Sequence, residues 1–197
     1  MSVLHGTTTV GLKLRDSVVV AADKRASQGY FIAHKRVRKI IKIDDHVVMS
    51  IAGLVADAQI LASQLQYLAR KYKYEEGVQV PVRTLVSYLG LLLNTYKYFP
   101  FEVQLIIGGY DTEPRLYAVQ WFGDYTEENY AVTGSGSPVA IGLIESRYSA
   151  DLSVDEAIKL ALEAIRASTR RDVFSGEGVD VAVVRKGSVE IGTYSLW

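Results

Sequence analysis

Gly6-Thr7-Thr8-Thr9-Val10-Gly11, near the start of the chain, carries the strongest signal in this sequence. A threonine run beside valine is typical of a β-strand, because β-branched side chains fit a pleated, half-buried surface. A threonine with a free α-amino group would also place a base with a pKa of about 8 on the residue that carries a hydroxyl nucleophile. The Gly6–Thr7 bond is therefore the first place to look for such a nucleophile, although the run alone favours the simple start of a strand.

Strands and helices come in blocks along the rest of the chain. Apolar runs bounded by turn residues predict strands at 7–14, 17–23, 36–43, 46–52, 102–109, 115–121, 179–185 and 188–194. Helical spacing and start signals, such as Pro81, Ser137-Pro138 and the capping box at Ser153, predict helices at 54–73, 81–96, 137–147 and 153–171. Because strands and helices do not alternate one by one, we expect an α+β fold with two mainly antiparallel sheets packed face to face and helices outside.

One lysine stands out in the segment 36–43. Strand alternation places Lys39 between Val37 and Ile41 on a face that we expect to point inward. Lys35 lies on that face too. Burial penalises the charged form of a lysine, so an inward Lys39 must be paired with an acid or have a lowered pKa. The alternative is that Lys39 is one more cation in a solvated basic run.

The composition limits the classes of function. With 197 residues, 49% of them hydrophobic, the chain is long enough for one well-cored domain. Its 22 basic and 22 acidic residues leave no net charge, so neither nucleic acid nor a membrane is expected as a partner. Cysteine is absent, and His5, His34 and His46 lack the spacing of metal ligands, so no metal site is expected.

Localisation and cofactors are predicted from motifs that the sequence lacks. The first six residues have neither a charged region nor a long apolar run, and no apolar run reaches the length of a membrane span. We therefore expect a cytoplasmic protein. A Gly-x-Ser-x-Gly elbow, a complete dinucleotide-binding glycine loop and a phosphate-binding Gly-Lys-Ser/Thr motif are all missing, so no cofactor is expected.

Three residues form a set with a specific spacing: Thr7 at its Gly–Thr junction, Asp23 after the apolar run 18–22, and Lys39. Further motifs follow at Ser50-Ile51-Ala52-Gly53, Gly134-Ser135-Gly136, Arg171-Asp172, Ser175-Gly176 and Gly178-Val179-Asp180-Val181. Together they resemble the β-type subunits of the archaeal proteasome core particle (20S), which are N-terminal nucleophile (Ntn) hydrolases. The resemblance covers nearly the whole chain, and it implies a four-layer αββα sandwich.

The resemblance also implies a role for each matching residue. Residues 1–6 are expected to be a prosegment and residues 7–197 a single catalytic domain, with the Gly6–Thr7 bond as the cleavage site. Thr7 is expected to be the nucleophile of a threonine endopeptidase, with Lys39 as its electrostatic partner and Asp23 orienting that lysine. Gly53 is expected to provide the backbone N–H of the oxyanion hole. Three further matches are expected to hold the amino group of Thr7 and the proton network around it: Ser135, Asp172 and Ser175.

By the same resemblance, apolar residues line the pocket for the substrate residue before the scissile bond: Ala26, Val37, Ile41, Ile51 and Val55. Without a charged residue in that set, we expect cleavage after hydrophobic residues. The expected substrates are unfolded proteins. The expected partners are other β-type subunits in a seven-membered ring, α-type subunits in outer rings and a ring ATPase that unfolds substrates.

Two other interpretations stay open. An inactive β-type subunit would retain residues 1–6 and build a mixed ring while another chain performs the chemistry; the intact set of Thr7, Asp23, Lys39, Ser135 and Asp172 argues against this role. The two-ring bacterial peptidase that begins with Thr-Thr is a second relative. The segment after Ser153 fits the longer proteasome family better than this shorter peptidase.

Overall fold

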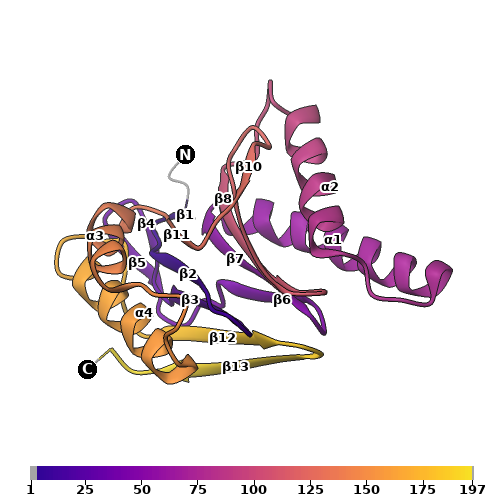
Figure 1. Cartoon of the computed structure of the whole chain (residues 1–197). Coiled ribbons are helices and arrows are strands. Elements are labelled where there is room, and N and C mark those ends of the chain that lie inside the picture. The colour runs from indigo at the N-terminus through magenta and orange to yellow at the C-terminus, as the bar shows by residue number, and fades with distance from the viewer. Residues whose placement is uncertain (1–3, 197) are drawn as a thin grey trace.

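The computed structural model describes residues 4–196, and the side chains from residue 6 onward. Two stacked sheets lie between two pairs of helices (Figure 1). The helices are α1 (Val55–Glu76), α2 (Val82–Thr95), α3 (Ser137–Arg147) and α4 (Val154–Ser168). The strands are β1 (Leu4–His5), β2 (Thr9–Lys13), β3 (Val18–Asp23), β4 (Ala26–Gln28), β5 (Phe31–His34), β6 (Ile40–Asp44), β7 (Val47–Gly53), β8 (Val103–Tyr110), β9 (Pro114–Val119), β10 (Tyr125–Glu127), β11 (Tyr130–Thr133), β12 (Val179–Arg185) and β13 (Ser188–Tyr194).

The sheets are antiparallel throughout the described residues. One five-stranded sheet has the order β10-β9-β8-β7-β6, the other has the order β11-β2-β3-β12-β13, and a small third sheet has the order β1-β4-β5. Helices α1 and α2 pack on the first five-stranded sheet, and α3 and α4 pack on the second. The predicted α+β sandwich with four layers is therefore confirmed.

Strand β3 shows why the central strands are apolar on both faces. Val18, Val20 and Ala22 pack in the layer between the two sheets, whereas Val19 and Ala21 pack toward α3 and α4. All five side chains are fully buried. A strand that is covered on both faces needs a continuous apolar run instead of an alternating one, which is the pattern that the sequence has here.

Gly11 in β2 brings the two sheets close together. A Cβ atom at this position would lie 2.8 Å from Cδ1 of Leu116 and 2.9 Å from Cγ2 of Ile106, both on the facing sheet. A larger residue would have to displace the Leu116 and Ile106 side chains, because packed interiors have no free space for an extra carbon. The glycine that closes the Gly6–Gly11 stretch therefore serves sheet packing.

The structure corrects several predicted boundaries. The strand expected at 36–43 begins only at Ile40, so Lys39 precedes β6, and Lys35 is exposed instead of facing inward. The helix expected to reach 171 ends at Ser168, and α3 is capped by Gly136, one residue earlier than expected. Short strands of two to four residues were not predicted, because they are too short to show alternation: β1, β4, β5, β10 and β11.

Candidate active site

Several chain segments end at one place in the sandwich. Thr7 lies just before β2, and Asp23 is the last residue of β3. Because β2 runs antiparallel to both β3 and β11, the start of β2 meets the end of β3 and the end of β11. Ser135 lies two residues after the end of β11, and Asp172 lies between α4 and β12. Residues that are far apart in sequence therefore surround Thr7.

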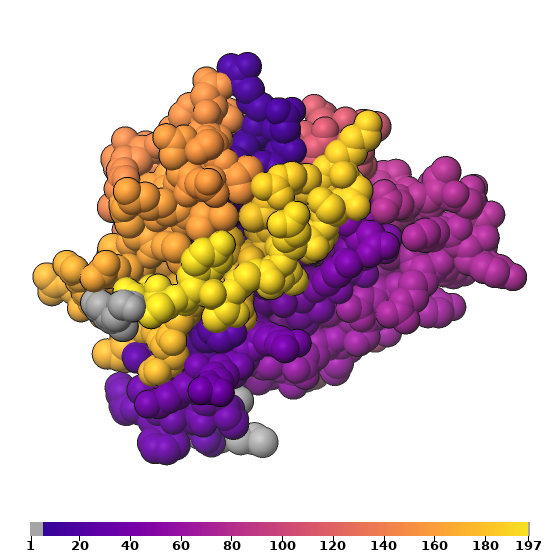
Figure 2. Space-filling view, turned by 90° about the horizontal axis from the view of Figure 1, so that it is seen from below, coloured from indigo at the N-terminus to yellow at the C-terminus, as the bar shows by residue number. Residues whose placement is uncertain are grey.

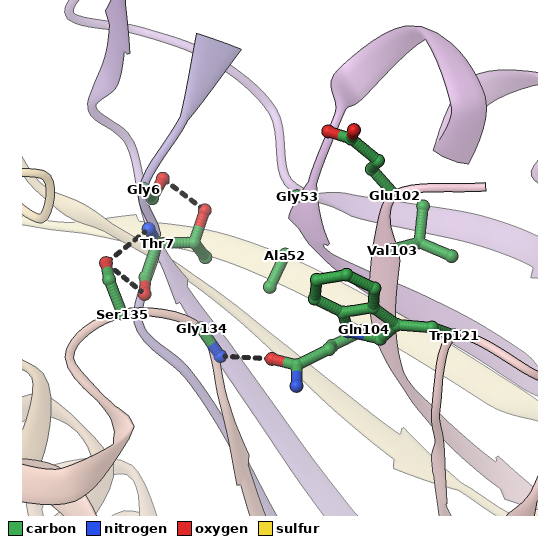
Figure 3. A pocket seen from close by; sticks show the side chains of 10 residues that line it. All are labelled: Gly6, Thr7, Ala52, Gly53, Glu102, Val103, Gln104, Trp121, Gly134 and Ser135. Atoms are coloured by element: carbon green, nitrogen blue, oxygen red, sulfur yellow. Dashed lines mark hydrogen bonds between the residues drawn. The ribbon is translucent and has the colours of Figure 1, made fainter. Parts of the chain in front are cut away.

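The hydroxyl of Thr7 contacts the peptide bond that precedes it (Figure 3). Thr7 is 3% exposed, and its Oγ1 donates a hydrogen bond to the carbonyl oxygen of Gly6. The Nζ atom of Lys39 donates to the same oxygen at 3.0 Å. A hydroxyl group and an ammonium group therefore meet at the carbonyl of the Gly6–Thr7 bond.

Lys39 and Asp23 form a buried ion pair. Their side chains are 3% and 0% exposed, and Nζ lies 2.9 Å from Oδ1 of Asp23. Burial lowers the pKa of Lys39, and the neighbouring Asp23 carboxylate opposes this shift. Asp23 also accepts backbone N–H groups of Thr8 at 3.0 Å, Arg25 at 3.0 Å and Gly176 at 2.9 Å. The carboxylate is thus held in one position, and it holds Lys39 in turn.

A second hydrogen-bond network begins at the nitrogen of Thr7. Its N–H donates to Oγ of Ser135 at 3.3 Å, and the Ser135 hydroxyl donates to Oδ2 of Asp172 at 2.7 Å. The Ser175 hydroxyl donates to the same oxygen at 2.6 Å. Because the proton of Ser175 is used in that bond, the Thr8 hydroxyl, 2.7 Å from Oγ of Ser175, is the donor between these two. The nitrogen of Thr7 is thereby connected to a carboxylate.

Glycine is required at two positions of the site. Gly6 has φ 109°, and a Cβ atom there would lie 2.0 Å from Cβ of Phe174. Gly53 has φ 111°, and a Cβ atom there would lie 2.0 Å from the carbonyl oxygen of Glu102. Both backbones are in a left-handed region that side chains rarely adopt. Gly6 can therefore pack against Phe174, and Gly53 against the carbonyl of Glu102, only because glycine carries no side chain.

Two hollows flank Thr7. The wider hollow has a volume of about 300 Å³ and lies between Thr7, Gln104 and Trp121 (Figure 3). Its other lining residues are Gly6, Ala52, Gly53, Glu102, Val103, Gly134 and Ser135. The narrower hollow has a volume of only about 10 Å³ and is lined by Gly6, Thr7, Ala26, Lys39, Ile51, Gly53 and Val55. The wider hollow therefore has room for a side chain, whereas the narrower hollow, with Gly6 in place, has room for about one water molecule.

Comparison with known proteins decides the family. The family model described as "Proteasome subunit" matches residues 3–184. The chain belongs to the proteasome subunit family. It is similar to proteins named "Proteasome subunit beta 2" from archaea. In Hyperthermus butylicus the identity is 54% over 183 residues, which cover 93% of this chain and 86% of that protein.

Two further archaeal relatives with the same name support this assignment. The protein of Ignicoccus hospitalis is 47% identical over 193 residues, covering 98% of this chain and 91% of that protein. The protein of Sulfolobus acidocaldarius is 45% identical over 194 residues, covering 98% of this chain and 96% of that protein. The predicted resemblance is confirmed: the chain is a β-type, archaeal-like proteasome subunit, and this family assembles with other subunits into the proteasome core.

The structure places only part of the expected substrate pocket beside Thr7. Ala26, Ile51 and Val55 line the narrower hollow. Val37 and Ile41 are outside the lining of that hollow; Ile41 packs against the core under α1 and α2. The assignment of all five residues to the pocket stays a prediction for the proteasome subunit.

Some residues of the site were not predicted from the sequence. The Thr8 hydroxyl joins the network of Asp172, and the threonine run was the only available signal for it. Gln104 accepts the N–H of Gly134 at 3.3 Å and lines the wider hollow together with Trp121. Neither Gln104 nor Trp121 stands in a recognisable motif, so sequence patterns alone could not indicate them.

Among residues 4–196, no group of three or more His, Asp or Glu side chains could hold a metal ion. Within the same range no helix is long and apolar enough to cross a membrane.

Proposed function

We propose that this β-type proteasome subunit is a threonine endopeptidase that exposes its own nucleophile by cleaving the Gly6–Thr7 bond. One observation carries the proposal: the Thr7 hydroxyl and the Lys39 ammonium group both donate to the carbonyl oxygen of Gly6. This arrangement favours an attack on that carbonyl, because the hydroxyl and a positive charge reach the same group.

The self-cleavage step follows from this geometry. Oγ1 of Thr7 attacks the carbonyl carbon of Gly6 and loses its proton, and the Lys39 ammonium group stabilises the negative charge that develops on the carbonyl oxygen. The carbon–nitrogen bond then breaks, the nitrogen of Thr7 takes up a proton, and the two residues are joined by an ester. Water hydrolyses the ester. Residues 1–6 leave with a new carboxylate, and Thr7 keeps a free amine and its hydroxyl.

The same groups then act on substrates. The new amine would lie against Ser135, whose hydroxyl is held by Asp172, and Lys39 would remain beside the position that the Gly6 carbonyl oxygen leaves. The amine accepts the hydroxyl proton as Oγ1 attacks a substrate carbonyl, and it delivers this proton to the leaving amine. The backbone N–H of Gly53 is proposed to bind the oxyanion, a donor that contributes about 2.7 to 4 kcal/mol in comparable sites. Water releases the acyl group.

The specificity proposal rests on the narrower hollow. Ala26, Ile51 and Val55 line it with apolar atoms, and Lys39 is the charged residue in its lining, already paired with Asp23. We propose that this side receives the hydrophobic residue before the scissile bond, after the departure of Gly6 has opened it. Val37 and Ile41 would extend its wall. The wider hollow would then receive the first residue of the leaving peptide.

The assembly proposal completes this function. The subunit would stand in a seven-membered ring of β-type chains between rings of α-type chains, and a ring ATPase would deliver unfolded proteins to the enclosed Thr7 residues. Residues 1–6 would act as the prosegment and residues 7–197 as one catalytic domain in the cytoplasm. Confinement of the nucleophile inside a particle would protect folded proteins from cleavage.

The deciding experiment is Thr7→Ala in the particle assembled with an α-type subunit. Intact mass should show that residues 1–6 are retained, and hydrolysis of fluorogenic peptides should disappear, while the particle still forms. Thr7→Ser is the matched control and should retain both cleavage events, because serine keeps the hydroxyl and the amine. Activity that survives in Thr7→Ala would show that another residue attacks. A wild-type chain that retains residues 1–6 and stays inactive in the particle would support the structural role instead.

A further inference from the structure

The two stacked sheets have their edges on opposite sides of the molecule. Strands β6 and β13 form the edges on one side, and strands β10 and β11 form the edges on the other (Figure 1). Edge strands expose unpaired backbone groups, and proteins cover or charge them to control association. The charges that this chain carries at its two sides are opposite in sign.

The side formed by β6 and β13 is basic. A cleft of about 1120 Å³ lies between β13, β6 and the loop that precedes β6. Seen from below, the yellow strand β13 runs beside the violet segment that contains this loop (Figure 2). Lys35, Arg36 and Arg38 line the cleft, and all three are exposed. None of the three forms an ion pair within residues 4–196.

The remaining charges of this cleft are already neutralised. Lys24 pairs with Asp180 at 2.5 Å, and Lys42 pairs with Asp45 at 2.8 Å. The cleft also exposes apolar surface, because the Ile191 side chain on β13 is 46% exposed. Three free cations beside exposed apolar atoms are typical of the rim and centre of a protein interface.

The side formed by β10 and β11 is acidic. A hollow of about 480 Å³ lies between these strands and α3, and Glu128, Tyr130, Ile141 and Glu145 are among its lining residues. Asp124, just before β10, lies at the same edge and is exposed. No ion pair involves Asp124, Glu128 or Glu145 in the part of the chain that the structure describes. Glu145 also accepts a hydrogen bond from the Tyr130 hydroxyl at 3.4 Å. Three carboxylates without an ion pair therefore match the three cations of the basic cleft in number and are opposite to them in charge.

We propose that the basic edge of one copy of this chain docks on the acidic edge of the next copy. The contact joins two different patches, and such a head-to-tail contact repeats around a ring instead of closing a dimer. The proposal rests on the β-type ring of the proposed function and deepens it, but it does not depend on the chemistry of Thr7. It also explains how a chain with 22 basic and 22 acidic residues, and hence no net charge, can attract its own copies.

The contact should depend on salt. Charges at the rim of an interface steer association and select partners, and they are screened beyond about 10 Å at 0.1 M salt. Exposed pairs contribute little one by one, so a set of three is needed for a measurable effect. Reversal of one edge replaces three attractions by three repulsions. We expect it to raise the concentration for half-assembly on the order of 10- to 100-fold at low salt.

The test uses charge reversal in the Thr7→Ala chain, so that assembly is measured without any proteolysis. The basic-edge variant carries Lys35→Glu, Arg36→Glu and Arg38→Glu. The acidic-edge variant carries Asp124→Lys, Glu128→Lys and Glu145→Lys. The control for the basic-edge variant has the same change in net charge on exposed residues of α1 and of the loop after α2: Arg70→Glu, Lys73→Glu and Lys97→Glu. Native mass spectrometry at low and high salt, with and without an α-type subunit, gives the subunit number of each.

The expected result is that each single-edge variant loses assembly, that the chain with both edges reversed regains it, and that the control keeps it. Regained assembly also shows that the reversed edges still fold. Single-edge variants that assemble at wild-type concentration would overturn the proposal. So would a wild-type chain that stays monomeric in all conditions, or one that assembles only when a second β-type chain is added, because the neighbour would then be a different chain.

A second measurement avoids large charge changes. The chain has no cysteine, so Arg36→Cys combined with Glu145→Cys places one thiol on each edge. A flexible bismaleimide should then join the particle into a ladder of covalent oligomers. The two single-cysteine variants should give no products beyond dimers. A double variant that also gives only dimers would contradict the head-to-tail contact.

Discussion

Asp23→Asn should separate the chemistry of the site from its stability. The Asp23 carboxylate is fully buried and accepts a hydrogen bond from Nζ of Lys39 and from the backbone N–H groups of Thr8, Arg25 and Gly176. Asparagine has nearly the same shape. It lacks the negative charge, and one of its two polar atoms is a donor that would face other donors. Lys39 would therefore lose its counter-charge while it remains buried.

The magnitude can be estimated from the structure. Two unit charges 2.9 Å apart attract each other by about 6 kcal/mol at an effective dielectric constant of about 20. The loss has an upper limit, because Lys39 can release its proton; at pH 7 this costs about 5 kcal/mol for a lysine with an ordinary pKa. We therefore expect Asp23→Asn to lower the free energy of unfolding by about 3 to 5 kcal/mol, the usual cost of breaking a buried pair.

The chemical effect should be larger than the stability effect alone explains. A neutral Lys39 cannot stabilise the negative charge on the Gly6 carbonyl oxygen, so removal of residues 1–6 should slow by about 100-fold or more. Intact mass against time in the assembled particle measures this rate, and urea unfolding measures stability. Asp180→Asn is the matched control. Asp180 pairs with Lys24 at 2.5 Å with a side chain that is 8% exposed, so its loss should reduce stability but leave cleavage intact.

Two results would refute this reasoning. If Asp23→Asn removed residues 1–6 at the wild-type rate, the Lys39–Asp23 pair would have no part in the reaction. If Asp180→Asn slowed the removal of residues 1–6 as much as Asp23→Asn did, the loss of stability alone would explain the slower cleavage. The position of the Lys39 charge beside Gly6 would then not matter.

Three further predictions follow from the same site. Gly53→Ala should reduce peptide hydrolysis by about 100- to 1000-fold, because the new Cβ atom would displace the backbone from the carbonyl of Glu102; unchanged kinetics would exclude Gly53 from the oxyanion site. Burial lowers the pKa of Lys39, so between this lowered pKa and the ordinary pKa of lysine the unfolded chain binds more protons than the folded chain. The free energy of unfolding should therefore rise with pH across that window, and this gain is lost as the pH falls to the lowered pKa. Urea unfolding of wild type and Lys39→Met between about pH 7 and pH 10 checks this sign, since the difference should grow with pH in favour of wild type; a difference that stays constant would contradict it. Val55→Glu places a carboxylate beside the narrower hollow, so cleavage of fluorogenic peptides after arginine should rise relative to cleavage after leucine; an unchanged ratio would remove Val55 from the pocket.

Prediction from the sequence succeeded where neighbours in the chain decide the structure. The apolar run Val18–Ala22 and the capping box at Ser153 depend on local spacing, and both appear as expected in β3 and α4. Prediction failed for short strands such as β4 and β10 and for the start of β6, because pairing with another strand, and not local propensity, determines these elements.

The sequence by itself therefore determined the four-layer order of strands and helices, the family, and the candidates Thr7, Asp23 and Lys39. Only the tertiary structure decided that Thr7 and Lys39 meet at the carbonyl of Gly6 while Asp23 pairs with Lys39. It also decided that Gln104 and Trp121 line a hollow beside Thr7, and that opposite edges of the sandwich carry opposite charges. The physical reason is that local propensity acts over a few residues. The meeting of distant residues depends on the order in which the strands pair, and no single segment of the chain contains that order.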